Sequence, residues 1–190
     1  MNGLHLHTTK RIVRIRCNSR LEENVNHGTT EKIRRVYSFT MTKQAAGLLV
    51  YRTDGELEVF LVHPGGPFYS KKDDGVWSIP KGLFEADEDP LTAARREFEE
   101  ETGQKIAGDF FKLKPITQKG GKIVFAWAVE AEVDAGNIVS NTFELEWPPK
   151  SGKKQEFPEV DRGAWFDVKT AKRKINPAQA ALLDELISRV

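Results

Sequence analysis

The stretch from residue 76 to residue 104, VWSIPKGLFEADEDPLTAARREFEEETGQ, constrains this 190-residue chain more than any other. Asp89 is a good N-cap, and Pro90 stands where the first helical residue belongs, because its missing N–H would find no intrahelical partner there. The residues that follow contain no further proline, and their first glycine, Gly103, is placed to end a helix in the left-handed conformation. The stretch therefore predicts a loop over 82–89 and then a helix of about three turns.

Three glutamates of this predicted helix, Glu97, Glu100 and Glu101, stand at positions i, i+3 and i+4, so they occupy one small arc of its surface. Alone they would repel one another and destabilise the helix. A hard divalent cation removes the repulsion and takes carboxylate oxygens as ligands, and magnesium also keeps several waters and accepts phosphate oxygens. The other interpretation is a solvated acidic face, as on most Glu-rich helices. A neighbouring apolar stripe is expected to pack into the core: Leu91, Ala94 and Phe98.

The three glutamates belong to a longer pattern, which consists of Gly82, five residues, Glu88, seven residues, and then the run from Arg96 to Gly103. This pattern resembles the Nudix box, G-x5-E-x7-R-E-U-x-E-E-x-G-U, in which U is an apolar residue. Every fixed position matches except the last, where Gln104 replaces an apolar residue. Because that departure concerns packing after the helix, it leaves the carboxylates unaffected.

The resemblance covers about residues 44–190 and implies a Nudix fold, which is α/β in class with a mixed β-sheet between α-helices. It also implies a Nudix hydrolase, a pyrophosphohydrolase that cleaves a small-molecule substrate containing a nucleoside diphosphate linked to another group. Water attacks a phosphorus in that reaction, assisted by a divalent metal ion. The implied cofactor is Mg²⁺, for which Mn²⁺ can substitute, and its implied ligands are Glu97, Glu100 and Glu101.

Four glutamates are implied to be catalytic, and one of them would take a proton from the attacking water: Glu97, Glu100, Glu101 and Glu159. Glu159 precedes the expected strand with Trp165, and Glu156 is the second choice for this extra acid. Both are merely solvated loop acids in the other interpretation. Gly82 is implied to let the backbone approach the metal or the phosphates.

Lys81 is placed to contact substrate phosphate as a point charge, unless it is an ordinary solvated lysine. Glu88 and Arg96 are expected to support the site structurally, as an ion pair that pins the loop to the helix. His63, at the end of a predicted strand, is expected to be a hydrogen-bonded residue at the rim of the site.

A nucleoside triphosphate or a dinucleoside polyphosphate is the expected substrate, because Pro80-Lys81-Gly82 resembles the start of the box in hydrolases of those nucleotides. No tyrosine follows Tyr69, which weakens the dinucleoside assignment. The alternatives are a nucleotide-binding or sensor module without turnover, and an RNA 5′-end pyrophosphohydrolase. Four aromatic residues are candidates for stacking on a base, although packing in the core or a loop is the other interpretation: Phe68, Tyr69, Trp127 and Trp147.

The charge of the chain is unevenly distributed. Residues 1–40 hold eight Lys and Arg residues against three Glu residues, whereas the remainder has a small excess of acids. A mildly acidic body does not suit nucleic-acid binding, which favours a basic face. No apolar run approaches the roughly 20 residues of a membrane span. The single cysteine, Cys17, excludes an internal disulfide and fits a reducing compartment, so a cytoplasmic protein is expected.

Two parts are expected along the chain: a basic, poorly ordered tail over 1–40 and a Nudix hydrolase domain over 41–190. Targeting and normally untranslated upstream sequence are the alternatives for the tail. Alternation and turn signals predict strands at 46–51, 57–63, 77–79, 112–118, 122–131 and 164–166. Residues 134–163 read as a long loop. A last helix is expected to begin at Asn176-Pro177. Its predicted apolar face consists of Leu183, Leu186, Ile187 and Val190. The oligomeric state does not follow from the sequence.

Residues 1–40 lack hydrophobic periodicity, and the first credible strand comes shortly after Met41. A chain that begins at Met41 is therefore expected to fold and to keep the full activity and melting temperature of the whole chain. Thermal unfolding followed by circular dichroism checks this expectation. A large fall in the melting temperature would contradict it, because it would mean that the N-terminal residues pack on the domain.

Overall fold

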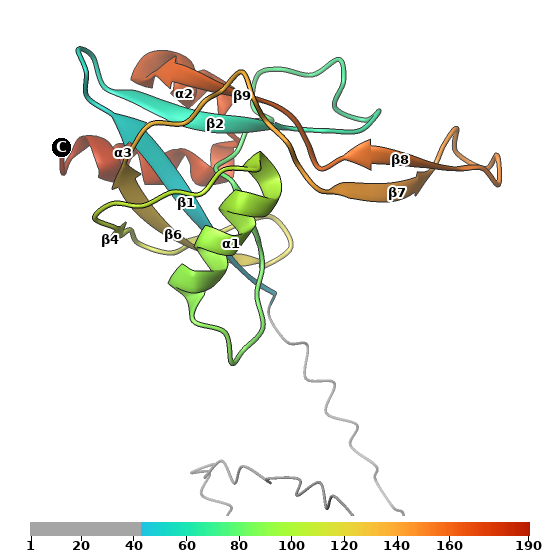
Figure 1. Ribbon diagram of the computed structural model, residues 1–190, viewed down its shortest axis with the longest axis horizontal. Helices are drawn as coiled ribbons and strands as arrows, with labels where there is room; N and C mark the ends of the chain where they lie inside the picture. The colour runs from blue at the N-terminus through green and yellow to red at the C-terminus, as the bar shows by residue number, and fades with distance from the viewer. Residues whose placement is uncertain (1–42) are drawn as a thin grey trace, which may run out of the picture. The chain divides into compact units, whose positions relative to one another are not determined.

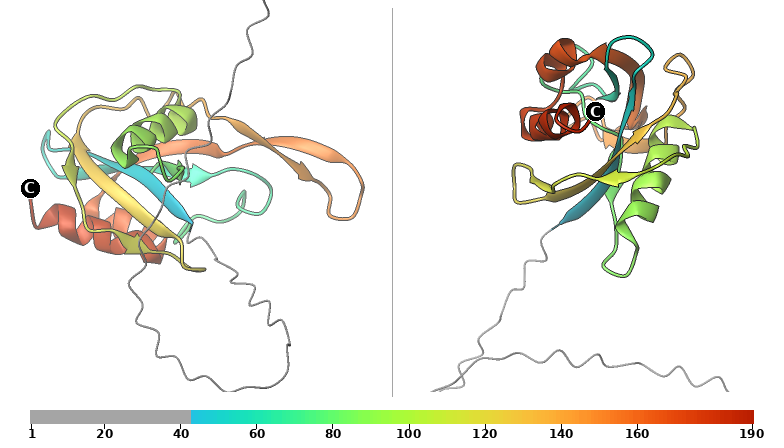
Figure 2. Two further views of the ribbon diagram at one scale, coloured as in Figure 1. Left: turned by 90° about the horizontal axis from the view of Figure 1, so that it is seen from below. Right: turned by 90° about the vertical axis from the view of Figure 1, so that its left-hand side faces the viewer.

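The computed structural model describes residues 43–190, so the predicted tail over 1–40 lies outside the described residues. A seven-stranded mixed sheet lies between helix α1 (Pro90–Thr102) on one face and helices α2 (Val168–Lys174) and α3 (Ala180–Ile187) on the other (Figures 1 and 2). This arrangement confirms the expected fold class. Within residues 43–190, no helix is long and apolar enough to span a bilayer.

Strand β1 (Gln44–Arg52) is the centre of the sheet, whose main path runs β4-β6-β1-β2-β9. β1 pairs in parallel with β6 over its length and antiparallel with β2 and β3. The other strands have the following bounds: β2 (Glu58–Pro64), β3 (Lys81–Leu83), β4 (Phe111–Lys112), β5 (Ile116–Thr117), β6 (Ile123–Glu130) and β9 (Val160–Asp167). β3 can lie close to β1 because Gly47 has no side chain, and a Cβ there would stand 2.5 Å from the Lys81 Cβ.

The strands separate two hydrophobic cores, because successive side chains of a strand point to opposite faces. Leu48 and Val50 pack on the α1 side with Phe98, whereas Leu49 and Tyr51 pack on the other side with residues of α2 and α3. Each of these apolar side chains is buried, which stabilises the fold by about 1.5–3 kcal/mol per fully buried Leu or Phe. The sheet is therefore fixed on both faces.

Helix α1 has the predicted ends. The Asp89 side chain accepts a hydrogen bond from Thr92 N at 2.9 Å, and Gly103 caps the other end with a φ of 73°. Ala94 and Phe98 are fully buried, as expected, but Leu91 is only half-buried at the edge of the core.

Several predicted boundaries were wrong. The expected strand over 77–79 forms only isolated bridges, and β3 starts at Lys81, because Pro80 has no N–H and Ile79 N donates to the side chain of Gln179 instead. Strand β9 extends well beyond the predicted 164–166. The expected strand over 112–118 consists of two short strands, β4 and β5.

The expected loop over 134–163 contains a two-stranded hairpin, β7 (Thr142–Glu146) and β8 (Lys154–Pro158), which projects beyond the main sheet (Figure 1). Helix α2 was not predicted, although it has a capping residue: the Asp167 side chain accepts a hydrogen bond from Thr170 N. The last helix begins as a 3₁₀ turn, η1 (Pro177–Gln179), before α3. Val190 lies beyond α3 and is half exposed, so its place on the apolar face was wrongly predicted.

Candidate active site

A cavity of about 380 Å³, here called the acid pocket, collects most of the predicted site residues from three parts of the chain. β3 contributes Lys81 and Gly82, helix α1 contributes its glutamates, and the junction between β8 and β9 contributes Glu159. Its complete lining is Lys81, Gly82, Leu83, Glu97, Glu100, Glu101, Asn141 and Glu159. Four carboxylates predicted to be catalytic thus face one volume, although their roles remain predictions.

Gly82 lies directly against the carboxylate of Glu97. A Cβ on Gly82 would stand 1.7 Å from Glu97 Oε2 and 2.1 Å from its Cδ, so no other residue type fits without moving that side chain. β1 holds the glycine in place, because Gly82 pairs with Ala46 in the antiparallel β1–β3 ladder. The backbone of β3 and the buried side of α1 therefore meet at the wall of the acid pocket.

Arg96 connects the loop before α1 to the acidic arc of the helix. Its Nε lies 3.1 Å from Glu88 Oε1, and its Nη1 lies 2.7 Å from Glu97 Oε1 and 3.2 Å from Glu100 Oε1. Nη2 also donates to the Leu83 carbonyl at 3.3 Å. These partners, Glu88 first, raise the pKa of Arg96 above its ordinary value. The expected contact between Glu88 and Arg96 is therefore present, and it extends to two of the candidate metal ligands.

Negative charge is concentrated and partly desolvated in the acid pocket. Burial raises the pKa of Glu101 to about 7, and the charges of Glu97 and Glu159 act in the same direction. The backbone N–H of Lys81 donates to Glu101 Oε2 at 3.0 Å and opposes the shift. Burial likewise raises the pKa of Glu97, against the lowering effect of Arg96. The charged forms of Glu97 and Glu101 are therefore disfavoured chiefly by burial, and their protein partners offset this only in part.

This donor set fits a hard divalent cation that keeps part of its water shell. Carboxylate oxygens from one helix face, with further oxygens nearby, are the ligands that Mg²⁺ and Mn²⁺ prefer. Between residues 43 and 190, no three acidic, imidazole or thiol side chains already stand as a complete ligand set. In the described structure Arg96 bonds to Glu97 and Glu100, and Glu101 accepts a hydrogen bond from Lys81 N.

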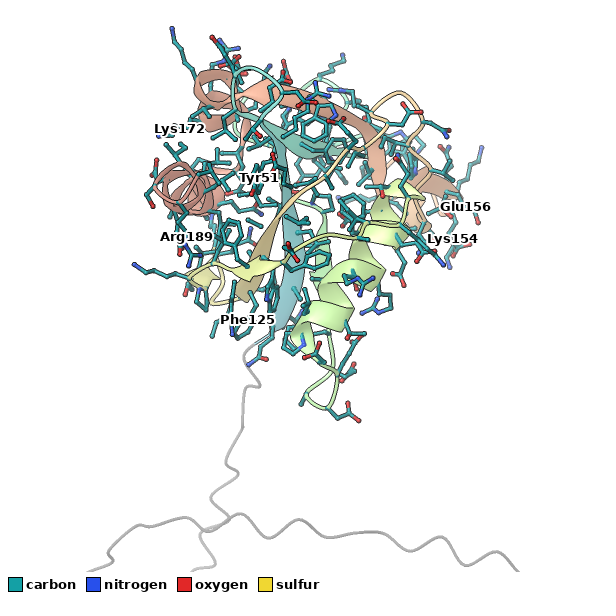
Figure 3. All side chains as sticks on the ribbon, turned by 60° about the vertical axis from the view of Figure 1, so that its left-hand side comes forward. Tyr51, Phe125, Lys154, Glu156, Lys172 and Arg189 are labelled. Atoms are coloured by element: carbon teal, nitrogen blue, oxygen red, sulfur yellow. The ribbon has the colours of Figure 1, made fainter. Side chains whose placement is uncertain are left out.

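Glu159 is fixed by its backbone at the end of the β7–β8 hairpin. Its N–H donates to the Asn141 carbonyl and its carbonyl accepts from Gly65 N, both at 2.9 Å. Glu156, the second choice, lies on β8 opposite Glu144 and does not line the acid pocket; Figure 3 places it at the edge of the molecule with Lys154. The structure therefore brings Glu159, and not Glu156, to the glutamates of α1.

The aromatic candidates are widely separated. Trp127 is buried in the core beside α1, whereas Phe68 packs edge-to-face on Trp147 with ring centroids 5.4 Å apart. Tyr69 is partly exposed and lines a different cavity. His63 is fully buried and bonded to Asp161 and to the Lys72 carbonyl, so its place at the rim was wrongly predicted.

Two polar residues were undervalued by the sequence interpretation. Asn141 lines the acid pocket, but no local pattern marks it. Gln104, the departure from the box, forms hydrogen bonds across the chain to the 134–137 turn. Its Nε2 donates to the Asp134 carbonyl at 2.9 Å, and its Oε1 accepts from Asp134 N at 2.9 Å. Where the box has an apolar residue, the Gln104 amide thus holds the 134–137 turn by hydrogen bonds.

Comparison with known proteins identifies the family. The model of the NUDIX domain family matches residues 41–186. The chain belongs to the NUDIX domain family. The predicted resemblance to the Nudix superfamily and the predicted class of enzyme, a Nudix hydrolase, are thereby confirmed. A relative of this NUDIX domain is the RNA pyrophosphohydrolase of Bartonella henselae, 27% identical over 152 residues, which are 67% of this chain and 78% of the relative.

Solved structures have the same fold as this NUDIX domain. A Caenorhabditis elegans Ap4A hydrolase in a binary complex aligns with a TM-score of 0.53 and 22% identity, over 76% of this chain and 96% of its own. The NUDIX domain of Shewanella oneidensis NrtR, complexed with ADP ribose, aligns with a TM-score of 0.54 and 15% identity, over 80% of this chain and 90% of its own. At these identities the likeness concerns the fold.

The contact between Gly82 and Glu97 predicts a defect that is confined to the acid pocket. We expect Gly82→Ala to stay folded, because the obstructing atoms are the end of a flexible side chain, and to lose about a hundredfold in hydrolase activity through displacement of Glu97. Gly136→Ala is the matched control, since its Cβ would meet only Asp134 Oδ1 at 3.3 Å. Thermal melts and steady-state rates compare the two. Equal activity would mean that the close approach is irrelevant to catalysis.

Proposed function

We propose that this NUDIX domain is a Mg²⁺-dependent pyrophosphohydrolase that cleaves a phosphoanhydride bond of a nucleotide-type substrate, with Mn²⁺ able to replace Mg²⁺. The observation that carries the proposal is the convergence of four carboxylates, from α1 and from the β8–β9 junction, on one cavity beside the Gly82 backbone. Membership of the NUDIX domain family supports it.

Glu97, Glu100 and Glu101 hold the divalent cation in this proposal. When bound, such a cation neutralises phosphate charge and makes water a better nucleophile. Arg96 and Glu88 position the acids: the guanidinium keeps Glu97 and Glu100 on one side of α1, and Glu88 ties the same guanidinium to the loop that follows β3. Gly82 leaves room for the Glu97 carboxylate and brings the β3 backbone to the pocket wall.

Glu159 is our choice for the group that takes the proton from the attacking water. It lines the acid pocket from a segment other than α1, and its fixed backbone holds it opposite the helix. A general base on a separate element can act on a water that the other acids help to place. Lys81, in the same lining, is proposed to bind a phosphate oxygen by charge.

A small-molecule substrate with a nucleoside diphosphate moiety is proposed, with a nucleoside triphosphate or dinucleoside polyphosphate as the first choices. The fold accommodates such ligands, since its neighbours include an Ap4A hydrolase and a domain complexed with ADP ribose. The cytoplasm, where such nucleotides are abundant, is the proposed compartment.

A second candidate is hydrolysis of the 5′ end of RNA, and the relative named RNA pyrophosphohydrolase favours it. The mildly acidic composition of the domain favours the small-molecule substrate, because nucleic-acid binding requires a basic face. A short 5′-triphosphorylated RNA and the matching nucleoside triphosphate separate the two: a kcat/KM more than about tenfold higher for the RNA would favour the second candidate.

Metal dependence is the first test of the proposed function. We expect EDTA to abolish nucleotide hydrolysis by the purified protein, and Mg²⁺ or Mn²⁺ to restore it, because the acidic arc requires a cation to approach an anionic substrate. Phosphate or pyrophosphate release is measured with nucleoside triphosphates and dinucleoside polyphosphates. Full activity in the chelator would exclude the metal role, and binding without turnover in either metal would favour a sensor module.

Two neighbouring glutamates of α1 provide a matched pair. Glu100 lines the acid pocket, whereas Glu99 is exposed and lies 3.6 Å from Lys105 Nζ. We expect Glu100→Gln to lower kcat by about a thousandfold through loss of a charged ligand, and Glu99→Gln to stay near wild type. Both should melt near the wild type, since relief of repulsion offsets lost contacts. Steady-state rates at saturating Mg²⁺ decide, and equal activity would make the arc an ordinary solvated face.

A further inference from the structure

A second cavity of about 260 Å³ is here called the amide pocket. Lys81 lines both this cavity and the acid pocket. The remaining lining comes from the loop after β2, the turn before β6, and the 3₁₀ turn η1 with the residue before it, and it includes Tyr69, Gln118, Lys122, Asn176 and Gln179. No acidic side chain lines the amide pocket. Of the residues in its lining, only Lys81 has a role in the function proposed above.

Gln179 has a buried hydrogen-bond donor without a partner. The residue is fully buried, and its Oε1 accepts from Ile79 N at 3.0 Å, which fixes the orientation of the amide because only the oxygen can accept from an N–H. Its Nε2 is the one buried side-chain nitrogen or oxygen in residues 43–190 that lacks a partner. Such groups are rare, and this one lies in a residue that lines a cavity.

Asn176 contributes a second side-chain amide to the lining. Its Oδ1 accepts from Ala178 N at 3.0 Å as the cap of η1, so its Nδ2 is not used by the cap. Asn176 is the N-cap of η1, and Gln179 is the last residue of the same turn. Both residues line the amide pocket, so its lining includes two side-chain amides whose oxygens are already occupied by backbone N–H groups.

Positive charge and an aromatic ring complete the lining. Burial, and then the charge of Lys81, lowers the pKa of Lys122, as expected for two cations that face one confined space. Tyr69 is 39% exposed, and its ring can cover a planar group. A ligand that suits this pocket is rich in acceptors, flat, and linked to phosphate on the side of the lysines.

We propose that the amide pocket is a base subsite that selects a 6-oxopurine, such as guanine or hypoxanthine. It rests on the nucleotide hydrolase function proposed above. A 6-oxopurine presents O6 and N7 as two acceptors on one edge, whereas adenine presents N7 beside the N6 amino donor. The donors of Gln179 and Asn176 match the first edge and oppose the second. Lys81 and Lys122 then lie along the path of the phosphates toward the acid pocket.

The test compares the binding of IMP and AMP, which differ at the purine 6-position, by isothermal titration calorimetry of the full chain in EDTA. We expect IMP to bind about tenfold or more tightly than AMP, since one buried donor must stay unpaired against adenine. The ratio of kcat/KM for ITP over ATP with Mg²⁺ should show the same preference.

Two variants remove one donor each while they keep the acceptor that the backbone needs. Gln179→Glu retains an oxygen for Ile79 N, and Asn176→Asp retains the cap of η1. Each should lower the IMP preference about tenfold or reverse it. Gln155→Glu is the matched control, because that amide donates only to the Trp147 carbonyl on the hairpin, and its preference should equal the wild type.

A direct readout does not depend on the variants. The side-chain amide signals of Gln179 in a ¹⁵N–¹H spectrum should shift with IMP and not with AMP, also if Gln179→Glu proves unstable. Equal binding of the two nucleotides, no binding of IMP at millimolar concentration, or an unchanged preference in the folded variants would overturn the subsite. Selective IMP binding without any hydrolysis would overturn the proposed function alone, and hydrolysis without base preference would overturn the subsite alone.

Discussion

The geometry of the candidate active site depends on Arg96, a side chain to which we assign no contact with the cation or the substrate. The guanidinium of Arg96 contacts the loop through Glu88 and the Leu83 carbonyl, and it contacts the helix face through Glu97 and Glu100. Because a guanidinium is a rigid planar fork, these contacts fix the loop and the acids relative to each other. A lysine at this position could not replace it, since a single ammonium cannot span the same set of oxygens.

Helix α1 and its caps could be predicted because their signals are local. Asp89, Pro90 and Gly103 act within one turn of their own positions, and the structure has both caps as expected. The spacing of Glu97, Glu100 and Glu101 likewise fixes their common arc, and all three line the acid pocket. The part of the site that lies on helix α1 could therefore be predicted from the sequence without any knowledge of tertiary contacts.

The rest of the site depends on contacts between distant segments, which leave no local pattern. Asn141, which lines the acid pocket, directly precedes the β7–β8 hairpin, and the hairpin is rich in polar residues, so that region resembled a polar loop. The amide of Gln179 bonds to Ile79, a residue a hundred positions earlier in the chain. Gln104 seemed a minor departure from an apolar position, yet its amide clamps the 134–137 turn. Gln104 and Gln179 each satisfy backbone groups that only the folded chain brings near.

The parallel pairing of β1 with β6 has a consequence for how the domain is made. The paired residues, from Gln44 with Ile123 to Tyr51 with Glu130, lie about eighty positions apart, and helix α1 is contained in the connection. During synthesis, β2 and β3 can join β1 early, while its other edge stays open until the ribosome has released β6. The central strand thus keeps one edge unpaired until β6 is made, and the nascent chain presents an apolar strand edge during that interval.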